Sequence, residues 1–133
     1  MKSKRFFQVM TATLIVLSLC TPVIAGATIM PFADPVFSSA FVTLKSGGVA
    51  DFVCNTVNSY NSVTLKSVSY QYKDGSKWVN GGSLSKPTNA ISSSSAYAGT
   101  TTYSLPSGKT CRLVAVFSAD SYTITKYSGQ VSF

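Results

Sequence analysis

The sequence contains few residues that could catalyse a reaction or bind a metal. It has no histidine and no glutamate, and its acidic residues are Asp34, Asp51, Asp74 and Asp120. Histidine is the commonest acid–base side chain and the commonest metal ligand. Its absence excludes Ser-His-Asp triads, Cys-His dyads and histidine-containing zinc sites. We therefore expect a protein that is not an enzyme and uses no cofactor or metal.

Two short patterns are compatible with other chemistry. A Ser-Lys catalytic pair could come from Ser85-Lys86 or from Ser107-Gly108-Lys109, but neither lies in a nucleophile motif. The segment Asp74-Gly75-Ser76 has one carboxylate, which is too few for the ~6–8 oxygen ligands of calcium. A tight turn is the better interpretation of that segment.

The aromatic residues Tyr70, Tyr72 and Trp78 form the candidate binding surface. Exposed aromatic rings stack on sugars or bind at protein interfaces. The other interpretation is a core face, because Tyr70 and Tyr72 share one side of a strand and cross-strand aromatic pairs stabilise ordinary sheets. A second aromatic set, open to the same two interpretations, consists of Tyr97, Tyr103, Tyr122 and Tyr127.

The first 27 residues have the three parts of a secretory signal peptide. A basic start precedes the apolar run 9–19, and Ala25 and Ala27 supply the small residues that signal peptidase reads. We expect cleavage after Ala27, secretion, and no stable membrane insertion afterwards. An extended lead over 28–36 and a β-sandwich domain over 37–133 would follow. The alternatives are an uncleaved anchor helix and a lipid anchor on Cys20.

The remaining cysteines, Cys54 and Cys111, agree with export. An even pair in a small secreted domain predicts one disulfide, which would stabilise the fold by about 4 kcal/mol. The alternative is two free buried thiols.

The charge of the mature chain is modest and dispersed. The whole sequence has a net charge of +7, and after residue 27 eight basic residues face four acidic ones, which leaves +4. Arg112 is the one arginine in that part, and no two basic residues are adjacent. Nucleic-acid binders cluster Lys and Arg, so we expect no nucleic-acid partner. Attraction to anionic cell-wall polymers remains compatible with this charge.

Short Ser-, Thr- and aromatic-rich segments separated by turns indicate β-structure after residue 36. A phase shift near Lys66 predicts a bulge, Gly129 marks a second candidate bulge, and the Ser-rich stretch 83–95 predicts a loop with an edge strand around Ala90-Ile91. The segment 110–117 is apolar on both faces, which is typical of a central strand. The expected strands are Phe37–Leu44, Val49–Val57, Val63–Tyr72, Lys77–Val79, Ala96–Tyr103, Thr110–Phe117 and Tyr122–Phe133.

About seven short strands in one domain predict an all-β fold, an antiparallel sandwich of the immunoglobulin or fibronectin type III kind, preceded by the signal-peptide helix. Cys54 on the second strand and Cys111 on the sixth would then lie in opposite sheets. The segment 105–116 (LPSGKTCRLVAV) resembles the turn and sixth strand of fibronectin type III domains, with Cys111 at the position of their tyrosine.

The segments 65–79 and 107–118 resemble a family of small secreted proteins of Gram-positive bacteria. That family has no established activity, so the resemblance implies export and a β-domain and no particular chemistry. The working hypothesis is a non-enzymatic binding module whose extracellular partner is a cell-wall polysaccharide or a protein. The alternative is a secreted antagonist, such as a bacteriocin-like toxin or an enzyme inhibitor.

Overall fold

The computed structural model describes residues 34–133, and all regular structure in that range is β-strand. The predicted signal peptide, with Ala25 and Ala27 at its cleavage site, lies outside the described residues, as does most of the lead over 28–36. Within the described range, no helix is long and apolar enough to cross a membrane.

The strands between residues 34 and 133 agree well with the segments expected from the sequence. The predicted strand after Gly75 continues further, to Leu84, and the predicted last strand is divided into two. The short edge strand expected near Ile91 is present. The strands are β1 (Phe37–Leu44), β2 (Val49–Thr56), β3 (Val63–Asp74), β4 (Lys77–Leu84), β5 (Ile91–Ser92), β6 (Ala96–Thr102), β7 (Thr110–Ala119), β8 (Tyr122–Tyr127) and β9 (Val131–Ser132).

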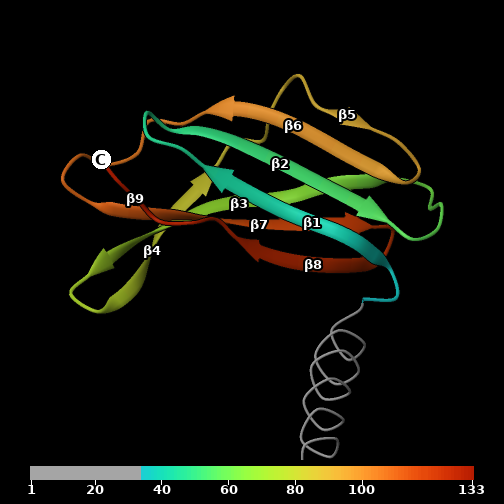
Figure 1. Ribbon diagram of the computed structural model, residues 1–133, viewed down its shortest axis with the longest axis horizontal. Helices are drawn as coiled ribbons and strands as arrows, with labels where there is room; N and C mark the ends of the chain where they lie inside the picture. Colours follow the sequence, from blue (N-terminus) through green and yellow to red (C-terminus); the bar gives the residue numbers. More distant parts are fainter. Residues whose placement is uncertain (1–33) are drawn as a thin grey trace, which may run out of the picture. The chain divides into compact units, whose positions relative to one another are not determined.

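The strands form two antiparallel sheets (Figure 1). Sheet A has the order β1-β2-β6-β5, and sheet B has the order β4-β3-β7-β8, with β9 also paired to β7. The predicted all-β class and antiparallel arrangement are therefore confirmed. The strand β7 lies inside sheet B, as its apolar sequence predicted, and the strands of Cys54 and Cys111 belong to different sheets.

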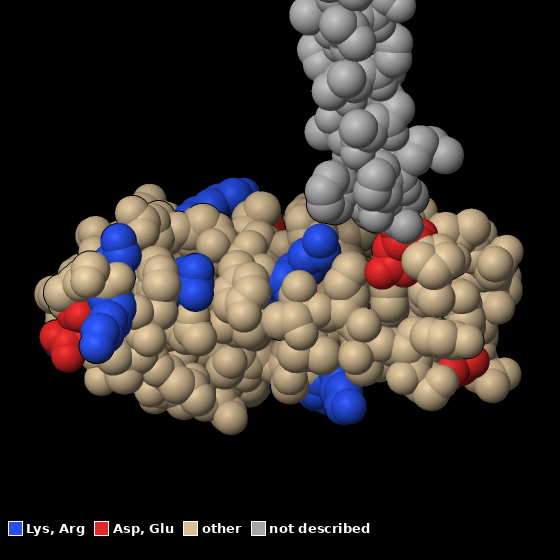
Figure 2. All heavy atoms as spheres, turned by 90° about the horizontal axis from the view of Figure 1, so that it is seen from below, with Lys and Arg blue, Asp and Glu red and all other residues tan. Residues whose placement is uncertain are grey.

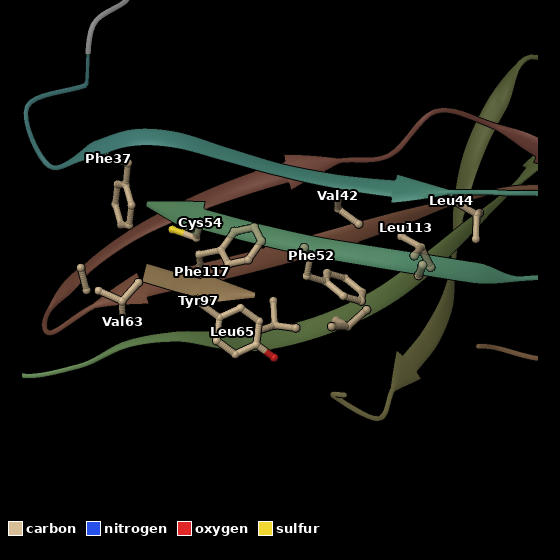
Figure 3. Packing of buried hydrophobic residues seen from close by; sticks show 14 of the residues in the cluster. Phe37, Val42, Leu44, Phe52, Cys54, Val63, Leu65, Tyr97, Leu113 and Phe117 are labelled. Carbon is tan, nitrogen blue, oxygen red and sulfur yellow. The ribbon is translucent and has the colours of Figure 1, made fainter. Parts of the chain in front are cut away.

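Alternating residues of the two sheets form one core between them (Figure 3). The burial pattern of β7 alternates along the whole strand, with Leu113, Ala115 and Phe117 fully buried. On the facing sheet, Phe52 and Cys54 of β2 are also fully buried. The period-2 alternation of these segments follows from strand geometry, in which successive side chains point to opposite faces.

Two predicted bulges fall in sheet B, at Lys66 and Gly129. The pairing of β3 with β7 shifts between Leu65 and Ser67, which confirms the bulge predicted near Lys66. The bulge predicted at Gly129 is wrong, because the chain leaves the sheet there and β8 and β9 become separate strands. The buried Ser128 hydroxyl accepts the Leu113 N–H at 2.8 Å and donates to the Gly129 carbonyl at 2.8 Å. The hydroxyl thus replaces sheet hydrogen bonds at the break.

The Ser-rich segment between β5 and β6 joins the two sheets. The carbonyls of Ser93 and Ser95 accept N–H groups of Val63 in sheet B at 3.1 Å and Thr56 in sheet A at 2.9 Å. The Ser92 hydroxyl adds a 2.6 Å bond to the Val63 carbonyl. Backbone hydrogen bonds therefore hold this part of the predicted loop against both sheets.

Candidate functional site

The hairpin of β3 and β4 determines which way its aromatic residues point. Gly75 and Ser76 form its two-residue turn, and Gly75 has a φ of 65°, a conformation that glycine adopts without strain. Asp74 then pairs with Lys77, Lys73 with Trp78, and Tyr72 with Val79. Paired residues of antiparallel strands share a face, so Trp78 lies on the face of Lys73, opposite to Tyr72.

The predicted surface of Tyr70, Tyr72 and Trp78 is therefore divided between two faces of sheet B. Tyr70 pairs with the fully buried Leu113, packs against the core and leaves no room for a Cβ at Gly81. Tyr72 pairs with Cys111 on that same inner side. All three aromatic side chains are half-buried, so the core interpretation applies best to Tyr70, and Trp78 alone belongs to the outer face.

On the outer face, Trp78 lies near Arg112, which is also close to Tyr127 of the second aromatic set. The Arg112 guanidinium lies 4.2 Å from the Trp78 ring centroid and 4.5 Å from that of Tyr127. Lys73 adds its ammonium at 5.5 Å from the Trp78 centroid. These distances are those of cation–π contacts, which hold an Arg side chain in place at little entropic cost. We call Lys73, Gln71, Trp78, Arg112 and Tyr127 the arginine clamp.

Gln71 completes the clamp with a side-chain hydrogen bond to Arg112. Its side-chain oxygen accepts the Arg112 Nε–H at 2.9 Å. The two Nη groups of Arg112 have no hydrogen-bond partner among residues 34–133. A guanidinium that lies close to two aromatic rings, and whose Nη groups have no partner in the described part of the chain, can donate two N–H groups to a carboxylate or phosphate.

The clamp lies on the more basic of the two sheets. The strands of sheet B carry Lys66, Lys73, Lys77, Arg112 and Lys126 against one acidic residue, Asp74. In the view of Figure 2, basic side chains are spread over the described surface with uncharged atoms between most of them. The field is therefore a mild attraction over the sheet, and the geometry of the clamp adds a specific position for an anion.

The sequence analysis did not select Arg112, Lys73 or Gln71, and it placed Tyr127 in the second aromatic set, apart from Trp78. One usable signal was present, because a two-residue turn at Gly75-Ser76 places Trp78 opposite Lys73 by simple counting. A second was Arg112 itself, a charged residue within the most apolar strand. The contact between Tyr127 and Arg112 depends on the pairing of β7 with β8, in which Val114 is opposite Tyr127. No local sequence pattern predicts that pairing.

The other candidates from the sequence are not brought together in the structure. The second aromatic set is divided, with Tyr97 and Tyr103 buried and Tyr122 and Tyr127 each 53% exposed. No hydrogen bond joins Ser85 to Lys86 or Ser107 to Lys109 in the described part of the chain. Lys109 instead stacks on the Tyr72 ring at 5.1 Å. Between residues 34 and 133, no three His, Cys, Asp or Glu side chains gather in a group that could hold a metal ion.

The disulfide predicted between Cys54 and Cys111 is corrected to two free, buried thiols. Cys54 pairs with Tyr97, whose ring lies against that of Phe117, with centroids 6.2 Å apart. Phe117 lies six positions after Cys111 on β7, which is about 20 Å along a strand. A disulfide needs Cα atoms within about 7 Å. Figure 3 shows Cys54 at the end of the core that holds Phe37 and Phe117, with Leu113 at the other end.

Burial also changes the acidity of the two thiols. Desolvation raises the pKa of Cys54 to about 11. Desolvation raises the pKa of Cys111 as well, and the nearby Lys109 charge offsets part of that effect. Neither thiol is therefore an activated nucleophile, since the thiolate is the reactive form.

Comparison of the chain with protein-family models, with curated proteins and with solved structures found no match.

Proposed function

We propose that this protein is a secreted, non-enzymatic binding module that binds acidic polysaccharide of the cell envelope through the outer face of sheet B. The observation that carries the proposal is the arginine clamp, in which Arg112 lies close to Trp78 and Tyr127 and its Nη groups have no hydrogen-bond partner among residues 34–133. The signal peptide expected over residues 1–27 supports an extracellular location.

The chemistry of the clamp fits a polymer that combines sugar rings with negative charges. Aromatic rings offer flat apolar surfaces for the C–H faces of sugars, and Tyr127 is 53% exposed. Arg112 supplies paired N–H donors for a carboxylate or phosphate, and Lys73 supplies a second positive charge beside Trp78. A neutral polysaccharide would use only the aromatic part of this surface.

The finer fold assignment is part of the same proposal. We infer an immunoglobulin-like sandwich, supported by the strand order of the two sheets. In the constant-type immunoglobulin fold, the first, second, fifth and fourth strands form one sheet, and the third, sixth and seventh form the other. The orders β1-β2-β6-β5 and β3-β7-β8 follow that arrangement when β4 is taken as an added edge strand.

The test is binding of the chain Thr28–Phe133, which contains all the described strands and their core, to purified cell-wall polysaccharide, polygalacturonate and neutral dextran. The decisive variants are Tyr127→Ala and Tyr122→Ala, because both residues lie on β8 and are equally exposed at 53%. We expect Tyr127→Ala and Arg112→Lys to weaken binding to the acidic polymers about 10-fold. Tyr122→Ala should stay within about 2-fold of the wild type.

Salt separates a specific site from general charge attraction. Binding that is partly retained at about 0.5 M salt supports the clamp, since stacking is not screened. The proposal is rejected if Tyr127→Ala and Tyr122→Ala bind alike, or if dextran competes as well as polygalacturonate.

A further inference from the structure

The outer face of sheet A carries an apolar row that crosses all four of its strands. Phe41 of β1 pairs with Val53 of β2, Val53 pairs with Ala98 of β6, and Ala98 pairs with Ile91 of β5. Phe41 is 46% exposed and Ile91 is 74% exposed. With strands spaced about 4.8 Å apart, the row is about 14 Å wide. Figure 1 shows the four strands as one layer of the domain.

Polar residues with partners within the chain border this row on both sides. On one side, Asp51 accepts hydrogen bonds from Thr100 at 2.7 Å and Thr43 at 3.3 Å and forms an ion pair with Lys45 at 3.4 Å. On the other side, Asn55 donates to the Ser39 hydroxyl at 2.9 Å. The row can therefore be covered without leaving a charge unpaired on its border.

Charge distribution indicates what covers it. Asp51 is the one charged residue in the strands of sheet A, and Lys45 pairs with it directly after β1. The basic excess of the domain lies on sheet B instead. Two copies of this domain repel each other least when they meet through sheet A, and a charged partner would find no complementary charge there.

We propose that two copies of this chain associate through the outer faces of sheet A. A two-fold axis parallel to the strands places Phe41 of one copy over Ile91 of the other, and Val53 over Ala98. The same surface then serves both copies, as two-fold symmetry requires. The two arginine clamps face outward in opposite directions.

The size of the face determines how strong this dimer is. Strand spacing and rise give an area of about 400 Å² per copy, about half of the ~800 Å² that each partner buries in a stable complex. The dimer is therefore weak, with a Kd between about 10 µM and about 1 mM. Such a dimer matters where the protein is concentrated on a surface, because two clamps on one polymer bind with avidity.

The experiment is sedimentation velocity of Thr28–Phe133 from about 10 µM to about 1 mM, at about 0.1 M and about 1 M NaCl. We expect the wild type to shift from monomer toward dimer over this range, at least as strongly in high salt. Phe41→Ser and Ala98→Glu should each weaken dimerisation at least about 10-fold. Val57→Ser is the matched control, since Val57 is 57% exposed and outside the row, and it should dimerise like the wild type.

Thermal unfolding of each variant shows that the fold is retained, and Ala98→Glu changes a residue that is already exposed. The proposal fails if the wild type stays monomeric at about 1 mM, if high salt abolishes the dimer, or if Val57→Ser weakens it as much as Phe41→Ser. No polysaccharide is present, so this failure is distinct from failure of the proposed function. Tyr127→Ala tests that independence, because it should dimerise normally.

Discussion

Sheet A and sheet B bury the same kinds of side chains toward each other, yet their outer faces differ in chemistry. Sheet A presents a neutral face with an apolar row in its middle and its one acidic residue paired. The outer face of sheet B presents Lys73 and Arg112, with Arg112 close to the rings of Trp78 and Tyr127. The inner positions are constrained by close packing, whereas the outer positions of each sheet are free to specialise.

This difference explains why the core residues carry no information about function. Phe52 and Phe117 are both fully buried and occupy equivalent inward positions on β2 and β7. The residues next to them in sequence point outward. They are Asp51 and Val53 in sheet A and Val116 and Ser118 in sheet B.

The largest expected effect is on thiol reactivity. Both cysteines should react with a thiol reagent at least about 1000-fold more slowly in the folded than in the unfolded protein, since buried thiols react only after opening. Cys111 should react before Cys54, because it lies next to Lys109 and outside the main core cluster. Mass spectrometry of timed alkylation measures both rates. If the protein, unfolded without a reducing agent, shows no thiols that react, Cys54 and Cys111 are not free and the assignment is wrong.

The next largest effect comes from the core aromatic residues. Phe52→Ala and Phe117→Ala should each lower the free energy of unfolding by about 3–5 kcal/mol, because each leaves a large cavity. Urea unfolding monitored by fluorescence measures both. The exposed Tyr127→Ala should cost less than about 1 kcal/mol. A small effect of Phe52→Ala beside a large effect of Phe117→Ala would mean that sheet A contributes little to the core.

Two adjacent glycines in the turn just before β2 test the close approach of the chain to Tyr103. Gly47 and Gly48 have φ values of 87° and 86°, so alanine is strained at either position. A Cβ at Gly48 would also meet the Tyr103 carbonyl oxygen, whereas nothing lies within 4 Å of one at Gly47. Gly48→Ala should therefore destabilise the fold by about 1–3 kcal/mol more than Gly47→Ala. Equal melting temperatures would refute this.

Tyr103 links the end of sheet A to the loop after β4. Its hydroxyl donates to the Ser85 carbonyl at 2.6 Å, so Tyr103→Phe should cost about 1 kcal/mol at neutral pH. Burial, and secondarily the charge of Tyr97, raises the pKa of Tyr103 to about 12. The neutral phenol therefore stabilises the fold below pH 10, and this contribution is lost as the pH rises toward 12. Between pH 10 and 12, the free energy of unfolding of Tyr103→Phe should therefore fall less than that of the wild type.

The smallest effect is expected from Asp51, the paired charge on sheet A. The hydrogen bond from Thr100, together with Lys45 and Thr43, lowers the pKa of this carboxyl below its ordinary value of 3.8. The carboxylate therefore stabilises the fold above that value, and the contribution is lost as the pH falls. Thr100→Val should move the Asp51 pKa upward in an NMR titration. Asp51→Asn should change the free energy of unfolding at neutral pH by less than about 0.5 kcal/mol. A larger loss would mean that solvent does not screen the pair of Asp51 and Lys45.

The strand pattern was largely predictable because it depends on local chemistry. Alternation along 110–117, the Asp-Gly turn at residue 74 and the phase shift near Lys66 all report backbone preferences of a few neighbouring residues. The split of the last strand was not predictable, since it depends on a hydrogen bond from Leu113 to the Ser128 hydroxyl. Likewise, the hydrogen bonds of Ser93 and Ser95 depend on strands of both sheets lying beside the segment between β5 and β6.

The sequence by itself determined that this chain forms short antiparallel strands with an apolar inner face, because side-chain alternation and turn residues act over a few positions. Only the tertiary structure decided which outer residues meet. Pairing of distant strands brought Arg112 close to Trp78 and Tyr127, aligned Phe41 with Ile91 across sheet A, and kept Cys54 away from Cys111. Register between strands has this power because a shift of one residue moves every side chain to the opposite face.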